Sequence, residues 1–161
     1  MVMNDPATAQ ISAFLDRIGI SVVIEALGDD TLLPAMTVRY GALVVDPARL
    51  TWPGDLLHEA GHIAVTDPAT RASLCEVPSD PAEEMAAIAW SYAAAVEIGL
   101  DPRIVFHDGG YVGGGGYLAD AFANEGSPGL PMLQWFGMTL DKRNAEKQGV
   151  LPFPHMSRWL R

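Results

Sequence analysis

The sequence predicts an α+β fold: a compact domain in which a small antiparallel sheet packs on one helix, with a second, buried helix beside it. Two observations predict this fold. Short runs rich in β-branched residues occupy the first third of the chain, and two longer segments with helical apolar spacing follow them. With 161 residues and 49% hydrophobic content the chain can bury one core, so residues 1–161 are expected to form a single domain.

The first helix is expected to begin after Asp5, which suits an N-cap, and to end at Gly19. Apolar residues recur at helical spacing between them. The three strands are expected at Ile20–Leu27, Thr37–Tyr40 and Ala42–Val45, where β-branched residues gather around turn residues.

The central feature of the sequence is the segment Asp55–Ile63, which reads Asp-Leu-Leu-His-Glu-Ala-Gly-His-Ile. His58 and His62 are four residues apart, so on a helix both imidazoles lie on one face and can bind one ion through neutral ring nitrogens. Glu59 lies about 100° around the same helix. A carboxylate there can take a proton from the attacking water without becoming a ligand. This HExxH pattern is typical of zincins and predicts a zinc site.

The residues around the motif suit a helix that forms the floor of a cleft. Leu56, Ala60 and Ile63 form an apolar stripe, the two histidines lie on the flanking face, and Pro53 is expected in the first turn. The alternative is an ordinary helix that carries the pattern by chance, which ordinary composition produces in about one chain of this size per few hundred. The apolar stripe favours the metal site.

A second helix is expected from Glu84 to Ile98, and it should be central and buried because it is apolar nearly all round. Asp80 as N-cap, Pro81 at N1 and Glu83 at N3 mark its start, in the arrangement of a capping box.

Two histidines alone would leave zinc under-coordinated, because catalytic sites usually carry three protein ligands and one open position. Glu83 and Glu84 follow His62 after a connector short enough to fold the second helix back onto the first, and Gly61 and Ala64 would permit close approach. Glu83 has a competing role at the cap, whereas Glu84 lies on a more apolar helical face, so Glu84 is the preferred third ligand. Alternatively, both acids only complement the helix dipole.

A glycine-rich segment at 109–116 contains six glycines but lacks the Lys-Ser/Thr of a P-loop. It is expected to be either a mobile loop over the cleft or a plain surface connector. His107 and Tyr111 are candidate catalytic donors that would stabilise the anionic intermediate of hydrolysis. Asp108 is an alternative partner for a zinc-binding imidazole.

The last third is expected to add short helices at Leu118–Asn124 and Pro131–Gly137, a charged surface segment at Asp141–Gln148, and an extended tail. Phe153 and Trp159 in the tail are expected to pack on the body or on a partner subunit.

The order of helix, small sheet with Gly-Ala-Leu-Val-Val-Asp at 41–46, HExxH helix and acidic start to an Ala- and aromatic-rich helix resembles the ImmA/IrrE group of gluzincin-like metallopeptidases. The resemblance covers about Phe14 to Ile98. It implies that zinc is bound by His58, His62 and Glu84 and that Glu59 is the catalytic base.

The chain also departs from that group. It has Ala87 or Ile88 where an Asn usually follows the downstream Glu, and no segment of residues 1–161 is expected to form a DNA-binding helix-turn-helix. In zincins an edge strand commonly binds an extended substrate by β-addition, and Ala42–Asp46 is the candidate strand.

Composition limits the choice of partner and compartment. The net charge of −10 disfavours nucleic acid or an anionic membrane as a partner. No apolar run reaches the roughly 18 residues of a spanning helix, and no signal-peptide pattern is present, so a cytoplasmic location is expected. Cys75 is the single cysteine, so no internal disulfide can form. It is expected to be a small packed hydrophobe rather than a zinc ligand.

The sequence therefore predicts a zinc metallopeptidase that acts on a peptide or protein substrate, with Glu59 as general base. The alternative is a non-catalytic or regulatory module with a structural zinc site, which requires a closed fourth ligand such as Cys75 or His107. A hydrolase of non-peptide substrates on the same site is a third hypothesis. The oligomeric state is left open.

Overall fold

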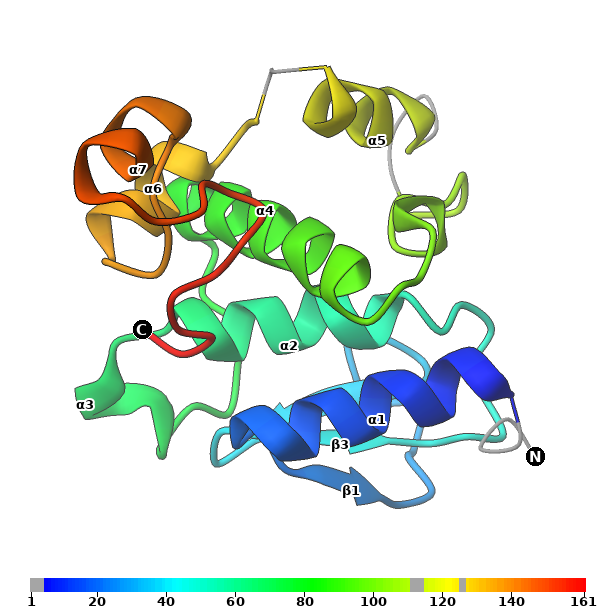
Figure 1. Cartoon of the computed structure of the whole chain (residues 1–161). Helices are drawn as coiled ribbons and strands as arrows, with labels where there is room; N and C mark the ends of the chain where they lie inside the picture. Colours follow the sequence, from blue (N-terminus) through cyan, green and yellow to red (C-terminus); the bar gives the residue numbers. More distant parts are fainter. Residues whose placement is uncertain (1–4, 111–114, 125–126) are drawn as a thin grey trace.

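The computed structural model describes residues 5–110, 115–124 and 127–161 and has an α+β architecture (Figure 1). In chain order the elements are α1 (Pro6–Ile18), β1 (Val22–Ile24), β2 (Met36–Arg39), β3 (Ala42–Val45), α2 (Asp55–Val65), α3 (Pro68–Arg71), α4 (Pro81–Glu97), the 3-10 turn η2 (Pro102–Ile104), α5 (Gly116–Ala123), α6 (Leu130–Trp135) and α7 (Lys142–Gln148). Helix α2 lies in the middle, with α1 and the sheet on one side and α4 on the other (Figure 1).

The sheet is mixed, with strand order β1-β3-β2. β2 and β3 are antiparallel, but β1 runs parallel to β3, so the prediction of a purely antiparallel sheet is wrong. The connection from β1 to β2 reverses the chain and leaves one strand position between them, and β3 fills that position. Tyr40 and Gly41 form the two-residue hairpin loop with φ of 52° and 73°, the left-handed conformation that such a loop requires.

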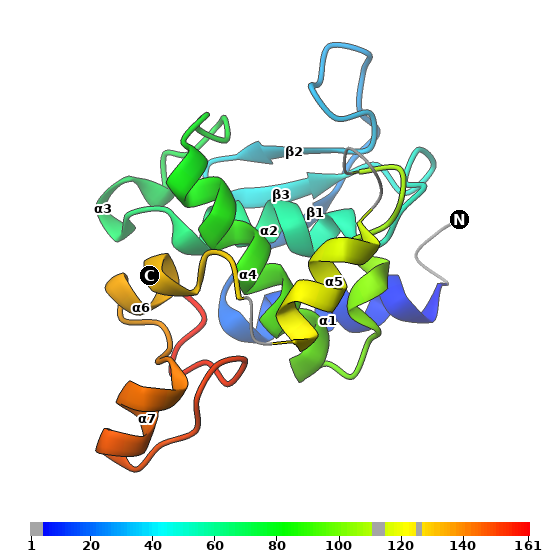
Figure 2. The ribbon, with the colours of Figure 1, turned by 90° about the horizontal axis from the view of Figure 1, so that it is seen from above.

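This strand order corrects the prediction that Ala42–Asp46 is an edge strand. β3 is the central strand, and its residues Leu43, Val44 and Val45 are all buried, as expected for a strand covered on both sides. The edges of the sheet are β1 and β2. Figure 2 shows the β1–β2 connection projecting beyond the sheet on the side of β2.

The helix ends follow the capping signals in the sequence, with one exception. The Asp5 carboxylate accepts a hydrogen bond from the Thr8 N–H at 2.9 Å, and Gly19 ends α1 with φ of 93°, as predicted. Pro53, expected in the first turn of α2, precedes the N-cap Gly54 instead. The reason is a tight turn before the helix, in which the Asp55 N–H donates to the Trp52 carbonyl.

Helices α2 and α4 pack closely because Gly61 has no side chain. A Cβ at that position would lie 2.8 Å from the Ala87 carbonyl oxygen. α4 is buried along most of its length, and Trp90 is completely buried. The predictions of small residues between the two helices and of a central second helix are confirmed.

The chain after α4 adds α5 and α6 close to the predicted helices, forms the further helix α7 where a charged surface segment was expected, and then folds back (Figure 1). Trp159 packs edge-on against Phe14 and Trp90, and Phe153 also packs against the core, so the predicted packing of both tail residues on the body is confirmed. The Arg161 N–H donates to the Ala64 carbonyl at the end of α2. One short helix, α3, begins at the Asp67-Pro68 pair, where only a connector was expected.

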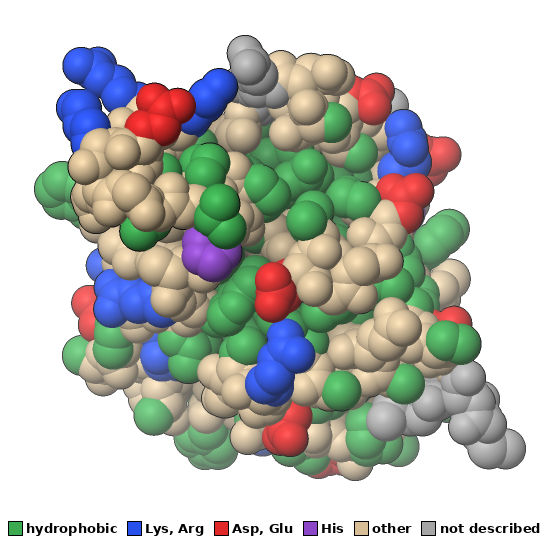
Figure 3. All heavy atoms as spheres, viewed as in Figure 1, with side chains coloured by type: hydrophobic (Ala, Val, Ile, Leu, Met, Phe, Trp, Pro, Cys, Tyr) green, Lys and Arg blue, Asp and Glu red, His purple; other side chains and the backbone are tan. Residues whose placement is uncertain are grey.

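On the face shown in Figure 3, basic side chains gather at the corner formed by α7, which carries Lys142, Arg143 and Lys147. Among the described residues, no helix combines the length and apolarity that a membrane crossing needs.

Candidate metal centre

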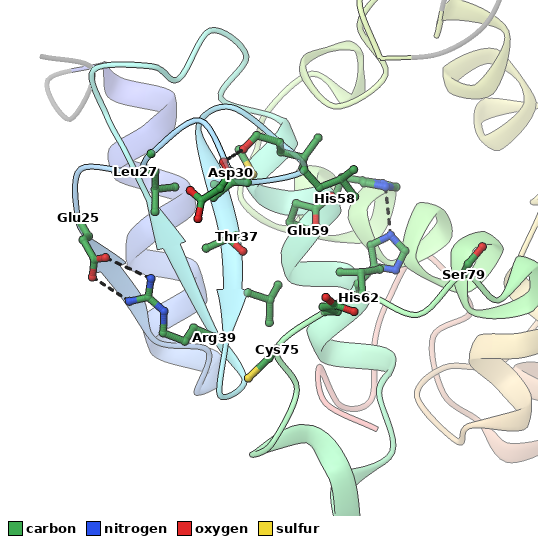
Figure 4. A pocket seen from close by; sticks show the side chains of 18 of the residues that line it. Glu25, Leu27, Asp30, Thr37, Arg39, His58, Glu59, His62, Cys75 and Ser79 are labelled. Carbon is green, nitrogen blue, oxygen red and sulfur yellow. Dashed lines mark hydrogen bonds and ion pairs between the residues drawn. The ribbon is translucent and has the colours of Figure 1, made fainter.

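A cleft of about 1000 Å³ opens between strand β2, the β1–β2 connection, helix α2 and the start of α4 (Figure 4). Its charged lining is mostly acidic: Glu25, Asp30, Glu59, Glu76 and Glu84 against Arg39. The single guanidinium is already neutralised, because its two NH2 groups lie 2.9 and 3.2 Å from the Glu25 carboxylate oxygens. The cleft is therefore suited to a cation.

His58 and His62 point toward one another on the cleft side of α2 (Figure 4). Their Nε2 atoms are 3.2 Å apart, and the two rings are nearly perpendicular, at 87°. The His62 side chain is almost completely buried, whereas that of His58 is about one-fifth exposed. One ion can therefore approach both nitrogens from the cleft.

Glu84 completes the group from the first turn of α4. Its two carboxylate oxygens lie 3.4 Å from His58 Nε2 and 2.9 Å from His62 Nε2. Glu83, the other carboxylate considered from the sequence, points elsewhere and lies 3.8 Å from the Arg161 guanidinium. The Asp80 carboxylate accepts from the Ala82 and Glu83 N–H groups, and this cap fixes which acid faces α2.

The separations of these atoms fit a small tetrahedral cation. Zinc binds nitrogen and oxygen at about 2.0–2.2 Å, so two ligands of a tetrahedral site lie about 3.3–3.6 Å apart. The measured separations of 2.9 to 3.4 Å are close to this value. The donor set of two imidazoles and one carboxylate suits zinc but also other divalent metals.

The pKa values in the group show strong coupling. Hydrogen bonds from His58 and His62 hold the pKa of the Glu84 carboxyl far below its ordinary value of 4.5. Burial lowers the pKa of the His58 imidazole, but its hydrogen bond to Glu84 and the charge of that carboxylate outweigh burial, and the net pKa lies above 6.5. A positive charge, as a proton or a metal ion, is therefore favoured between these side chains.

Glu59 lies beside the histidines without joining them in the group of candidate ligands. It faces the cleft between α2 and β2, where Thr37 lies opposite (Figure 4). Burial raises the pKa of the Glu59 carboxyl, and the charges of His58 and His62 act in the opposite direction. A carboxyl with a raised pKa, close to the candidate ligands, suits proton transfer.

Strand β2 is an edge strand and forms one wall of the cleft, and the β1–β2 connection already pairs with its first residue through a Leu33–Met36 bridge. Arg39 and Ala42 close the hairpin, and the Asp46 N–H donates to the Ala35 carbonyl, so hydrogen-bonded pairs fall on alternate residues of the ladder. By this alternation the backbone N–H and C=O of Val38 face away from β3. They are oriented to pair with an added strand.

The structure does not bring His107 into the lining of the cleft. Its side chain is buried and pairs with Asp55, with His107 Nε2 2.6 Å from Asp55 Oδ1. The alternative candidate Asp108 is exposed. Tyr111 lies outside the described residues.

The Asp55–His107 pair is the part of the site region that the sequence did not indicate. Its members are 52 residues apart, and only the position of Asp55 one turn before His58 hinted at a role. The prediction that Cys75 is a packed hydrophobe is wrong, because it is exposed at the rim of the cleft (Figure 4). The chain section between α3 and α4 has no regular structure that would cover its thiol.

No protein-family model matches the chain, and it has no significant match among curated protein sequences or solved structures.

Proposed function

We propose that the protein is a zinc-dependent metallopeptidase, in which His58, His62 and Glu84 bind the metal and Glu59 is the general base. The observation that carries the proposal is the geometry of the three side chains: ligand atoms 2.9 to 3.4 Å apart at the base of an open cleft. Glu59 is next to the first ligand in the sequence but is not one of the three.

Zinc bound in this group would supply a Lewis acid that polarises a carbonyl and makes water more acidic. Glu59 takes a proton from the attacking water while the water oxygen bonds to the peptide carbonyl carbon. The same carboxyl then gives the proton to the amide nitrogen as the C–N bond breaks. Two proton transfers through one side chain require a pKa above that of a solvated glutamate, and burial of Glu59 acts in this direction.

The substrate is proposed to bind as an extended strand along β2. The outward backbone groups of Val38 offer main-chain hydrogen bonds, which recognise a peptide independently of its side chains. Because β2 and α2 line the same cleft, such a strand would pass beside Glu59. This arrangement favours a peptide over a small non-peptide substrate.

The main alternative is a structural zinc site in a binding or regulatory module. Such a site is closed by a fourth protein ligand. Among the described residues, the group of potential ligands holds only three members, and Cys75 at the rim of the cleft is not one of them. A group of three in an open cleft supports the enzyme.

The test is cleavage of a peptide library by zinc-loaded wild type, Glu59→Gln and Glu76→Gln, followed by mass spectrometry. Glu76 is another cleft carboxylate outside the ligand group and serves as the matched control. Glu59→Gln should keep its zinc and melting temperature but cleave about 10²- to 10⁴-fold more slowly, whereas Glu76→Gln should keep the wild-type rate. Equal rates for wild type and Glu59→Gln would exclude the proposed base. A zinc-loaded wild type that cleaves no peptide would exclude the peptidase.

A further inference from the structure

His107 and Asp55 form a short, buried connection between two segments that are distant in the sequence. His107 Nε2 lies 2.6 Å from Asp55 Oδ1, and only 7% of the His107 side chain is exposed. The Trp52 indole stacks on the imidazole, with ring centroids 4.4 Å apart and an interplanar angle of 8°. The pair joins the segment after η2 to the first residue of α2.

The buried imidazole lowers the free energy of unfolding in a way that an apolar side chain at position 107 would not. His107 Nδ1 is buried and has no hydrogen-bond partner among the described residues. If the ring is neutral, Nε2–H donates to Asp55 and the lone pair of Nδ1 has no donor to accept from. If the ring is charged, Nδ1 carries a proton that has no acceptor. A buried polar atom without a partner is destabilising in either state. A residue that costs stability is a candidate for a functional role.

The pair lies at the N-terminal turn of α2, which has no side-chain cap. Gly54 is the N-cap and provides no side-chain hydrogen bond to the helix. A Cβ on Gly54 would lie 1.9 Å from the Ile104 carbonyl oxygen, so the backbone of η2 presses directly on this turn. The Gly54 carbonyl accepts from the N–H groups of Leu57 and His58. The turn that carries Asp55 therefore leads directly into the first candidate ligand.

We propose that Asp55 and His107 are positioning residues that hold the first turn of α2 against the 102–107 segment and so fix the placement of His58 and Glu59 in the cleft. The role of the pair in metal binding rests on the metal centre proposed above. Its effect on the helix can be measured without metal.

The test uses His107→Leu, which puts an apolar side chain of similar size in place of the imidazole and removes both ring nitrogens. In the metal-free protein, amide hydrogen exchange of Leu57 and His58 should become about tenfold faster or more, because their helical turn loses its anchor. The melting temperature should stay the same or rise, because the unsatisfied Nδ1 is gone. If His107 contributed only to global stability, faster exchange and a lower melting temperature would occur together.

Three further variants provide a rescue, a control and a second way to remove the pair. His107→Gln keeps an N–H donor near the position of Nε2 and should return the exchange rates toward wild type. Arg103→Ala removes an exposed ion pair with Asp120 in the same segment, at 3.4 Å, and should leave the exchange of α2 unchanged. Asp55→Ala breaks the same pair by removing its partly exposed carboxylate, and it should reproduce the effect of His107→Leu.

The metal readout uses Co²⁺ as the probe, because its visible absorption reports the geometry of its ligands. His107→Leu and Asp55→Ala should bind Co²⁺ about tenfold more weakly than wild type, with an altered spectrum, whereas His107→Gln should resemble wild type.

The positioning role is wrong if Leu57 and His58 exchange at wild-type rates in both His107→Leu and Asp55→Ala. It is also wrong if exchange rises uniformly along the chain together with a fall in melting temperature, because the pair would then act on global stability alone. A wild type that binds no Co²⁺ would refute the metal centre instead, while the exchange rates would still decide the role of the pair.

Discussion

Gly61 on α2 lies against Ala87 on α4, at a distance that leaves no room for a side chain: a Cβ at position 61 would be 2.8 Å from the Ala87 carbonyl oxygen. The contact sets the spacing of the two helices that provide the candidate ligands. Glu84 is on the same helix as Ala87, and His58 and His62 flank Gly61 on theirs. A close helix pair is therefore a condition for the metal centre.

Replacing Gly61 by Ala should lower both stability and metal affinity. Helix propensity favours Ala over Gly by about 1 kcal/mol. Overpacking costs about 1–3 kcal/mol, and the obstructing atom here is a backbone oxygen that cannot rotate away. We expect a net loss in the free energy of unfolding, measured by denaturant titration, together with weaker zinc binding in a competition assay.

The control for Gly61→Ala is Gly116→Ala, because a Cβ at position 116 would meet no atom of the described residues within 4 Å. This control should keep the wild-type stability or exceed it. A Gly61→Ala protein as stable and as tight in zinc binding as wild type would contradict the close-contact argument.

The choice between the two neighbouring acids can be tested directly. Glu84→Ala removes the carboxylate that lies 2.9 Å from His62 Nε2, so zinc affinity should fall by more than the roughly 10- to 100-fold expected for the loss of an outer-shell partner. Glu83→Ala removes only a contact of 3.8 Å with Arg161 and should leave zinc affinity nearly unchanged. Competition with a chromophoric chelator measures both variants, and the opposite order of affinities would show that Glu83, and not Glu84, is the third ligand.

The metal-free protein should show a characteristic pH dependence. The lowered pKa of Glu84 gives stability that is present above pH 4.5 and is lost as pH falls through the lowered pKa. The raised pKa of His58 gives stability that is present below pH 6.5 and is lost as pH rises through the raised pKa. Both contributions are present together between pH 4.5 and 6.5.

The measurement is the melting temperature of wild type and Glu84→Gln in the presence of a chelator, from about pH 5 to about pH 8. The advantage of wild type should be largest in the acidic half of this range and shrink as His58 loses its proton. A difference that stays constant across the range, or grows with pH, would refute the coupling between His58 and Glu84.

Local signals in the sequence were sufficient for the elements that position the candidate ligands. Asp5 and Asp80 cap their helices through side-chain hydrogen bonds, as their positions before Pro6 and Pro81 predicted. The helical face of Glu84, inferred from spacing alone, is the face that meets the two histidines. Caps and faces depend on residues within one or two turns, so a single sequence contains them.

Pairings between distant segments were not predictable in the same way. The central position of β3 depends on which strand fills the gap between β1 and β2, and residue alternation in such short strands does not encode this order. The same holds for His107, whose partner Asp55 is 52 residues away and whose burial depends on the stacked Trp52. The sequence marked His107 as chemically interesting, but only the fold could show what it contacts.

Titration of the metal-free protein with zinc, followed by calorimetry and elemental analysis, tests the central claim most directly. The separations of His58, His62 and Glu84 predict saturation at about one zinc per chain, and His62→Ala should abolish tight binding. A wild type that takes up no zinc, or a His62→Ala protein that binds zinc as tightly as wild type, would contradict the account.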